Sequence, residues 1–163
     1  MSKVSSTRNR PRGFTLIELV VVMVITAILL AIAIPGYLHQ IQQSRRTDAK
    51  SALLDLAARE QSVFATTQAY GTTPSSVGYS GAAFPVTVGS GYYQVSVAVT
   101  AAVAPTSVTS IGTPASFLLT ATPVPGTSQA NDTTCASFTL DQSGNQVATS
   151  SGGAITTSTC WGS

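Results

Sequence analysis

Hydrophobic residues are concentrated near the start of the chain. From Leu19 to Ile34, Thr26 is the only polar residue, which is the composition of a membrane-spanning segment. Because a bilayer offers no water to satisfy the backbone, a single apolar segment must be helical there. We therefore predict a helix from Phe14 to Leu38, about 37 Å long at the helical rise.

Helical spacing of apolar residues continues beyond this segment. They recur at i, i+3, i+4 and i+7, which predicts a helix face packed against a core. They are Ala49, Ala52, Leu53, Leu56, Val63 and Phe64. We predict one helix over residues 14–65, kinked at Pro35 and Gly36, with its second half packed on a soluble head. The alternative is that Pro35 ends the helix.

Residues 66–163 show the alternation of β-strands. Apolar and polar residues alternate in three segments, at 93–99, 117–121 and 136–140. Alternation with one apolar face predicts an antiparallel sheet, and we expect that face to cover the apolar stripe of the helix. The expected fold class is α+β, with a long N-terminal helix and a β head.

Loop signals separate the predicted strands. A stretch rich in Gly, Ser, Thr and Pro from Thr66 to Gly91 predicts a loop, and Ala101 to Pro114 predicts a long hairpin connection. The segment from Asp141 to Asn145 predicts a turn between two strands. A further strand is therefore expected after Asn145.

Residues 1–13 differ from the rest of the chain. They carry four basic residues and no acidic one, and they contain nothing that could form a core. The basic residues are Lys3, Arg8, Arg10 and Arg12. Such a segment is expected to be a processed leader. Gly13 would offer a peptidase a position without a side chain.

Glu18 is an acidic residue within an otherwise apolar run. A carboxylate in hydrocarbon costs on the order of 3 kcal/mol or more on insertion scales, so such a group is expected to have a partner. Cleavage of the chain just before Phe14 would create one, the free amine of the new N-terminus.

The segment Gly13-Phe14-Thr15-Leu16-Ile17-Glu18 resembles the processing motif of type IV prepilins, which type II secretion pseudopilins share. The resemblance implies cleavage after Gly13 by a membrane-embedded prepilin peptidase and methylation of the new Phe14 amine. It also implies that Glu18 acts in assembly, and that a cytoplasmic ATPase drives extraction from the membrane. The alternatives are an ordinary secretory signal cut after Ala33 and an uncleaved signal anchor.

The C-terminal segment carries a second, looser resemblance. The stretch from Cys135 to Trp161, with Cys160 and a TLDQSG turn, resembles the disulfide-closed loop of type IVa pilins, and most of all their minor pilins. The resemblance implies a Cys135–Cys160 disulfide, which would persist in an oxidising compartment. The alternative is two unpaired cysteines.

Charge is distributed as unevenly as hydrophobicity. The chain has a formal net charge of +2, but from Gln61 to Ser163 it holds no Lys, Arg or His. A head with so little positive charge is not expected to attract DNA. Arg45, Arg46 and Lys50 remain on the stem, and through them we expect at most weak, salt-sensitive binding. The basic leader favours a cytoplasmic N-terminus.

Residues that could support catalysis or bind a metal are few. His39 is the only histidine, and we expect it to lie at the membrane edge rather than to act as a base. Asp132 and Asp141 supply too few oxygens for a calcium site, which takes six to eight. We therefore predict no catalytic residue, cofactor or metal, and the shortage of calcium ligands weakens the pseudopilin alternative.

The combined prediction is a structural subunit of a type IV pilus, most like a minor pilin, with a leader at 1–13, a helix at 14–65 and a head at 66–163. Its expected partners are other pilin subunits, the processing enzyme and, indirectly, the assembly ATPase. It is expected in the inner membrane before assembly and in the extracellular pilus afterwards, serving adhesion, twitching motility or DNA uptake. Type II secretion pseudopilin and a tip binding module or DNA receptor are the alternatives.

Overall fold

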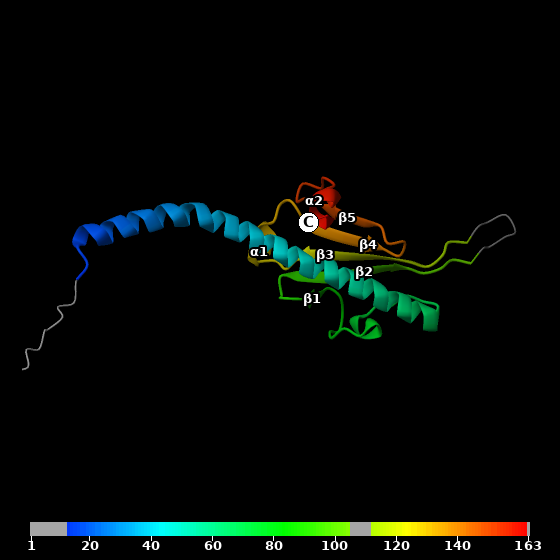
Figure 1. The fold of residues 1–163 in the computed structure, drawn as a ribbon. Coiled ribbons are helices and arrows are strands. Elements are labelled where there is room, and N and C mark those ends of the chain that lie inside the picture. The colour runs from blue at the N-terminus through cyan, green and yellow to red at the C-terminus, as the bar shows by residue number, and fades with distance from the viewer. Residues whose placement is uncertain (1–12, 105–111, 163) are drawn as a thin grey trace, which may run out of the picture. The chain divides into compact units, whose positions relative to one another are not determined.

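The computed structural model describes residues 13–104 and 112–162. The predicted leader therefore lies outside the described residues except for Gly13, and so does the middle of the 101–114 connection. The chain divides into two compact units, residues 1–39 and residues 40–163. Figure 1 shows the helices and the sheet.

Helix α1 spans Leu16–Thr67 and includes Pro35 without interruption. The prediction of one continuous helix is therefore confirmed, and the alternative that Pro35 ends it is wrong. A kink at Pro35 and Gly36 stays a prediction. In the second unit, Ala49, Leu53 and Leu56 are buried, as the apolar spacing predicted. Charged side chains are also buried on this helix, at Arg46 and Glu60.

The second unit contains a five-stranded antiparallel sheet in the order β1-β2-β3-β4-β5. Each strand pairs with its neighbour along the chain, so the sheet is a meander. The strands are β1 at Val86–Val88, β2 at Tyr93–Thr100, β3 at Ser116–Pro123, β4 at Ser137–Asp141 and β5 at Gln146–Thr149. The three predicted strands correspond to β2, β3 and β4, and β5 follows the predicted turn.

Register explains why one face of the sheet is buried. Val95 lies opposite Ala121, and Ala121 lies opposite Phe138. All three side chains are fully buried. They belong to one core with the buried residues of α1, and Figure 1 shows α1 crossing the sheet in this unit. Successive side chains of a strand point to opposite faces, so this register fixes which face meets the helix.

The loop predicted from Thr66 to Gly91 is only partly a loop. Helix α1 continues to Thr67, a 3-10 helix forms at Pro74–Val77, and β1 forms at Val86–Val88. The prediction was wrong for β1 because a three-residue strand is too short to show alternation, and its formation depends on pairing with β2. The 101–114 connection does join a hairpin, with a bridge between Val103 and Thr113.

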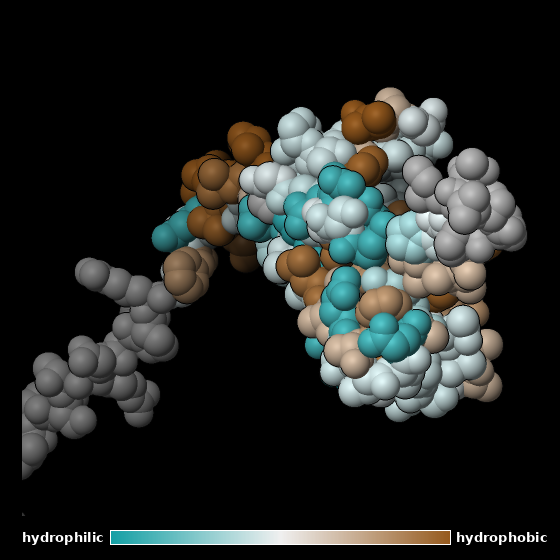
Figure 2. Space-filling model, turned by 90° about the vertical axis from the view of Figure 1, so that its right-hand side faces the viewer, coloured by the Kyte–Doolittle hydropathy of each residue, from teal (hydrophilic) through white to brown (hydrophobic). Residues whose placement is uncertain are grey.

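The surfaces of the two units differ in polarity. Figure 2 shows strongly hydrophobic residues gathered on the N-terminal part of α1. Most of the face of the second unit in this view is pale or hydrophilic. The apolar part of α1 is therefore the large hydrophobic surface in this view.

Candidate functional site

The apolar part of α1 exposes every large hydrophobic side chain between Phe14 and Leu38. Its most apolar 18-residue window has a mean hydropathy of 3.0 and is 0% buried. Within the part of the chain that the structure describes, α1 is the helix long and apolar enough to cross a membrane. Exposed apolar surface of this extent marks a segment that is covered by lipid or by other protein chains.

Thr15 caps the N-terminus of α1. Its hydroxyl oxygen accepts a hydrogen bond from the Glu18 backbone N–H at 3.3 Å, and its carbonyl accepts one from Leu19 at 3.3 Å. Thr15-Leu16-Ile17-Glu18 matches the S/T-x-x-E pattern of a capping box. Glu18 thus occupies a position at which a helix favours an acidic residue. Sequence reasoning missed this local reason for Glu18, although the spacing of Thr15 and Glu18 signals it.

Gly13 and Phe14 precede α1, and the Phe14 side chain is 85% exposed. A Cβ added at Gly13 would meet no atom of the described structure within 4 Å, so the fold itself does not require glycine there. Within α1, a Cβ at Gly36 would likewise meet nothing outside its own helical turn. Any requirement for glycine at position 13 must then come from another molecule.

A buried ion pair connects α1 to the segment before β4. The Arg46 guanidinium donates from Nε to Asp132 Oδ2 at 2.7 Å and from Nη2 to Oδ1 at 2.9 Å. The two side chains are only 5% and 2% exposed. Arg46 is therefore unavailable to an outside ligand, and its predicted contribution to DNA binding is wrong. The sequence gives no sign that this arginine, rather than Arg45, faces the core.

Neighbouring polar groups complete this buried network. Gln129 donates from Nε2 to the Tyr93 hydroxyl at 3.0 Å and to Asp132 Oδ2 at 3.1 Å. The Cys135 backbone N–H donates to Asp132 Oδ1 at 3.2 Å. Burial raises the pKa of Tyr93 to about 12, so its hydroxyl stays protonated. Asp132 is fully engaged in these bonds, and the described residues contain no cluster of three side chains suited to a metal.

Arg45 lies on the surface of the second unit. Its guanidinium carbon is 3.5 Å from the centroid of the Tyr92 ring, and Nη1 donates to the Ser128 hydroxyl at 2.7 Å. This stacking holds the guanidinium in one orientation. Burial and the nearby charge of Arg46 lower the pKa of Lys50. Arg45 and Lys50 are both half-buried, so two of the three predicted stem cations stay partly accessible at this surface.

Glu60 is a fully buried carboxylate on α1. Its Oε2 accepts the Gly71 backbone N–H at 2.7 Å, whereas Oε1 has no hydrogen-bond partner within the described structure. Burial raises the pKa of Glu60, although the Gly71 hydrogen bond opposes that effect. Glu60 lies four residues after Leu56 and seven after Leu53, so helical spacing places it on the apolar face, a signal that sequence reasoning missed.

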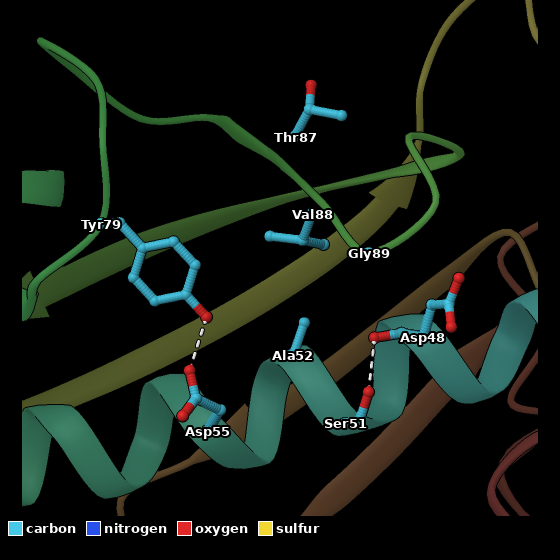
Figure 3. Close-up of a pocket in the computed structure, with 8 residues that line it drawn as sticks. All are labelled: Asp48, Ser51, Ala52, Asp55, Tyr79, Thr87, Val88 and Gly89. Atoms are coloured by element: carbon cyan, nitrogen blue, oxygen red, sulfur yellow. Dashed lines mark hydrogen bonds between the residues drawn. The ribbon is translucent and has the colours of Figure 1, made fainter.

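A groove lies between α1 and β1 in the second unit (Figure 3). It has a volume of about 470 Å³. Its lining residues are Asp48, Ser51, Ala52, Asp55, Tyr79, Thr87, Val88 and Gly89. The Tyr79 hydroxyl donates to Asp55 Oδ2 at 2.9 Å at one end of the groove. At the other end, Asp48 accepts hydrogen bonds from the backbone and hydroxyl of Ser90.

The groove carboxylate Asp55 is also paired with Arg59, whose Nε donates to Oδ2 at 2.8 Å. Burial opposes ionisation of Asp55, but the hydrogen bonds from Arg59 and Tyr79 and the charge of Arg59 together lower its pKa. Burial and the bond to Asp55 raise the pKa of Tyr79 to about 12. Asp55 is therefore ionised and Tyr79 protonated at neutral pH.

The disulfide joins Cys135 and Cys160, which are 25 residues apart in the sequence. It encloses β4, β5 and the short helix α2 at Thr157–Trp161. Trp161 packs edge-on against Phe138, with ring centroids 5.9 Å apart, and its indole N–H donates to the Val147 carbonyl. The alternative of two unpaired cysteines is thus wrong, and the bridge holds the C-terminal segment on the sheet.

Comparison with known proteins agrees with this architecture. Residues 8–34 match the model of the prokaryotic N-terminal methylation motif. The chain is 38% identical over 77 residues to the type IV major pilin protein PilA of Myxococcus xanthus. That alignment covers 47% of this chain and 35% of the relative, so the chain spans about a third of that protein's length.

A second family model covers most of the remaining fold. Residues 35–139, more than half of the chain, match the model described as type IV minor pilin ComP, DNA uptake sequence receptor. The match includes the second half of α1, strands β1 to β3 and most of β4. This chain therefore belongs to the family of type IV minor pilins of the ComP type.

Proposed function

We propose that this chain is made as a prepilin, cut between Gly13 and Phe14, methylated at the Phe14 amine, and assembled as a minor subunit into a type IV pilus. Before assembly it is held in the inner membrane with its N-terminus in the cytoplasm. The observation that carries the proposal is the exposed apolar surface from Phe14, just before α1, to Leu38 on α1. Lipid covers this surface first, and the helices of other pilin subunits replace the lipid in the filament.

We expect Glu18 to be required for assembly of the subunit into the filament. In an apolar filament core its charge can be neutralised by the free Phe14 amine of a neighbouring subunit. The capping bond between Thr15 and the Glu18 backbone offers a competing explanation, in which Glu18 only stabilises the helix N-terminus. The two roles predict different effects of Glu18→Gln, because glutamine can take part in a capping box but carries no charge.

The test compares Glu18→Gln with Glu18→Ala in cells, measuring leader cleavage, membrane level and the amount of subunit in sheared pili. Charge pairing predicts normal cleavage and membrane insertion, with loss of pilus incorporation in both variants. If Glu18→Gln assembles like the wild type and only Glu18→Ala fails, the capping role is sufficient and the pairing proposal is wrong. Thr15→Ser, which keeps the capping hydroxyl, is the control that should assemble normally.

DNA binding is a second candidate function, favoured by the description of the matching family. We propose that any such contact runs through Arg45 and Lys50, because Arg46 is buried and Arg59 is paired with Asp55. The head beyond Gln61 carries no basic residue, so we expect binding to be weak and to fall steeply with salt.

A mobility-shift series with a duplex of mixed sequence, at rising salt, tests this second candidate. Arg45→Ala should reduce binding to every sequence, whereas Arg59→Ala, a control at a paired arginine, should have a smaller effect. Tight, sequence-selective binding that persists in Arg45→Ala would contradict the proposal, and it would point to a recognition surface that does not depend on basic residues.

A further inference from the structure

One edge of the sheet, along β5, is covered by the C-terminal segment of the chain. The Ala148 N–H donates to the Thr157 hydroxyl at 3.0 Å, and the Ala148 carbonyl accepts the Thr156 N–H at 2.8 Å. The Trp161 indole N–H donates to the Val147 carbonyl at 3.1 Å. The backbone groups that β5 directs away from the sheet are thus paired within the fold at Ala148, which protects this edge from pairing with another chain.

The opposite edge of the sheet is covered over only part of its length. Strand β1 pairs with the first three residues of β2, from Tyr93 to Val95. It begins directly after Pro85, which has no backbone N–H with which to continue the ladder. Within the described residues, no strand lies on this side of β2 from Ser96 to Thr100, and Figure 1 shows β1 beside only one end of β2.

The hydrogen-bond pattern identifies the backbone groups that this gap leaves open. In an antiparallel sheet, successive residues of a strand bond alternately to its two neighbours. The Val124 N–H donates to the Tyr92 carbonyl at 2.9 Å, in continuation of the β2–β3 register, so the even-numbered residues of β2 bond with β3. The odd-numbered residues point to the β1 side, and β1 covers the first two of them. Val97 and Val99 are the next two, and the described residues provide no partner for them on that side.

A pocket of about 380 Å³ adjoins this open edge. Its lining residues are Gln68, Ala69, Tyr70, Thr72, Val99, Ala101, Ala102 and Ala115, none of which is an Asp, Glu, Lys, Arg or His. A charged group would lose hydration there without gaining an ionic partner, so the pocket favours a neutral, apolar side chain. Residues 96–102 also contain none of the charged residues or prolines that commonly protect an exposed edge.

We propose that the β2 edge at Val97 and Val99, together with this pocket, binds an extended, uncharged peptide strand of another polypeptide chain. The added strand pairs its backbone with the open N–H and C=O groups of these two valines. Side chains of directly opposite residues share one face of a sheet. Because Val99 lines the pocket, the side chain opposite Val99 reaches it. Backbone bonds thus supply affinity, and the pocket selects an apolar side chain.

The experiment titrates the full-length protein in detergent micelles against a fluorescein-labelled peptide, Thr-Val-Thr-Val-Thr with a glycine–serine tail, and follows fluorescence anisotropy, with empty micelles as the blank. The peptide extends the alternation of β1, Val86-Thr87-Val88, which already pairs with this edge. We expect saturable binding. N-methylation of both peptide valines should weaken it at least about fivefold, because each loses a backbone hydrogen bond to β2. N-methylation of the central threonine, whose N–H points away from β2, should weaken it less.

Variants of the protein locate the binding edge. Val99→Pro removes an N–H that does not bond with β3, a change that an open edge tolerates, and it should weaken binding at least about fivefold. Thr87→Pro, at the outer edge of β1, is the matched control and should bind like the wild type. Ala101→Lys, in the pocket, should weaken binding, whereas Ala104→Lys, at an exposed position outside the pocket, should not.

Trp161 fluorescence melting of each variant separates loss of the edge from loss of the fold. If Val99→Pro does not fold, the N-methylated peptides and the two lysine variants still decide the question. The proposal is wrong if the peptide shows no saturable binding at concentrations up to about 1 mM. It is equally wrong if folded Val99→Pro binds like the wild type, or if methylation of the valines and of the threonine has the same effect.

Discussion

Replacing Asp132 by Asn should destabilise the head more than any surface substitution. The change removes the charge that balances Arg46 and disrupts a bidentate pair whose side chains are 5% and 2% exposed. Removing one partner of a buried ion pair costs about 3–5 kcal/mol, because it leaves an uncompensated charge in the interior. A domain is typically stable by about 5–15 kcal/mol, so this loss is a large share of the total.

The assay is thermal unfolding of the full-length protein in micelles, followed by tryptophan fluorescence. Trp161 is the only tryptophan of the chain, and it packs against Phe138 in the head, so its emission reports head unfolding. For a unit of this size the expected loss corresponds to a fall in Tm on the order of 10–20 °C. Gln142→Ala, at an exposed residue of the turn after β4, is the control and should change Tm little.

A double variant tests whether the unpaired charge is the cause. Replacing the pair together, as Arg46→Met with Asp132→Asn, removes both charges, keeps an oxygen that can accept the Cys135 N–H, and should cost less than Asp132→Asn alone. If Asp132→Asn lowers the free energy of unfolding by less than about 1 kcal/mol, water reaches the Arg46–Asp132 pair in solution, and the reasoning from its burial is refuted.

Three further predictions concern the disulfide, Glu60 and the processing site. Serine at both Cys135 and Cys160 should lower head stability by roughly 3 kcal/mol and expose the C-terminal segment to protease, with leader cleavage unchanged. If this variant melts and resists protease like the wild type, the disulfide does not stabilise the head. Burial raises the pKa of Glu60 above its unfolded value, so the wild type loses stability as pH rises through that range. Glu60→Gln should therefore gain Tm relative to the wild type as the pH rises above the ordinary glutamate pKa of 4.5, and a constant difference would contradict this. Gly13→Val should leave the fold intact, since a Cβ there meets no atom of the described structure. It should block leader cleavage, which immunoblots of the precursor and mature forms would show. Normal cleavage would mean that the peptidase tolerates a side chain at this position.

Much of the fold could be predicted because its signals are local and periodic. The apolar run and the i, i+3, i+4 spacing predicted α1 to within a few residues, and alternation predicted β2, β3 and β4. Strand β1 could not be predicted in this way, because three residues show no period and only the pairing of Val86 with Val95 reveals it. Local pattern thus predicted the long elements and missed the short one.

The roles of individual charged residues were harder to predict. Arg45 and Arg46 are adjacent and chemically identical, and which one enters the core depends on the rotation of α1 against β4 and on the position of Asp132, 86 residues away. Glu60 is buried because the chain turns back after Thr67 and brings Gly71 to it. Helical spacing places Glu60 on the apolar face of α1, but the partner of each charged side chain depends on tertiary packing, which composition and spacing do not encode.

The measurement that tests the central claim most directly is intact mass spectrometry of this subunit recovered from sheared pili. The account predicts a chain that begins at Phe14, carries one added methyl group at its N-terminus and retains the Cys135–Cys160 disulfide. A chain that begins at Ile34, or that still carries residues 1–13, would contradict it, as would failure to find the protein in pili that contain other subunits.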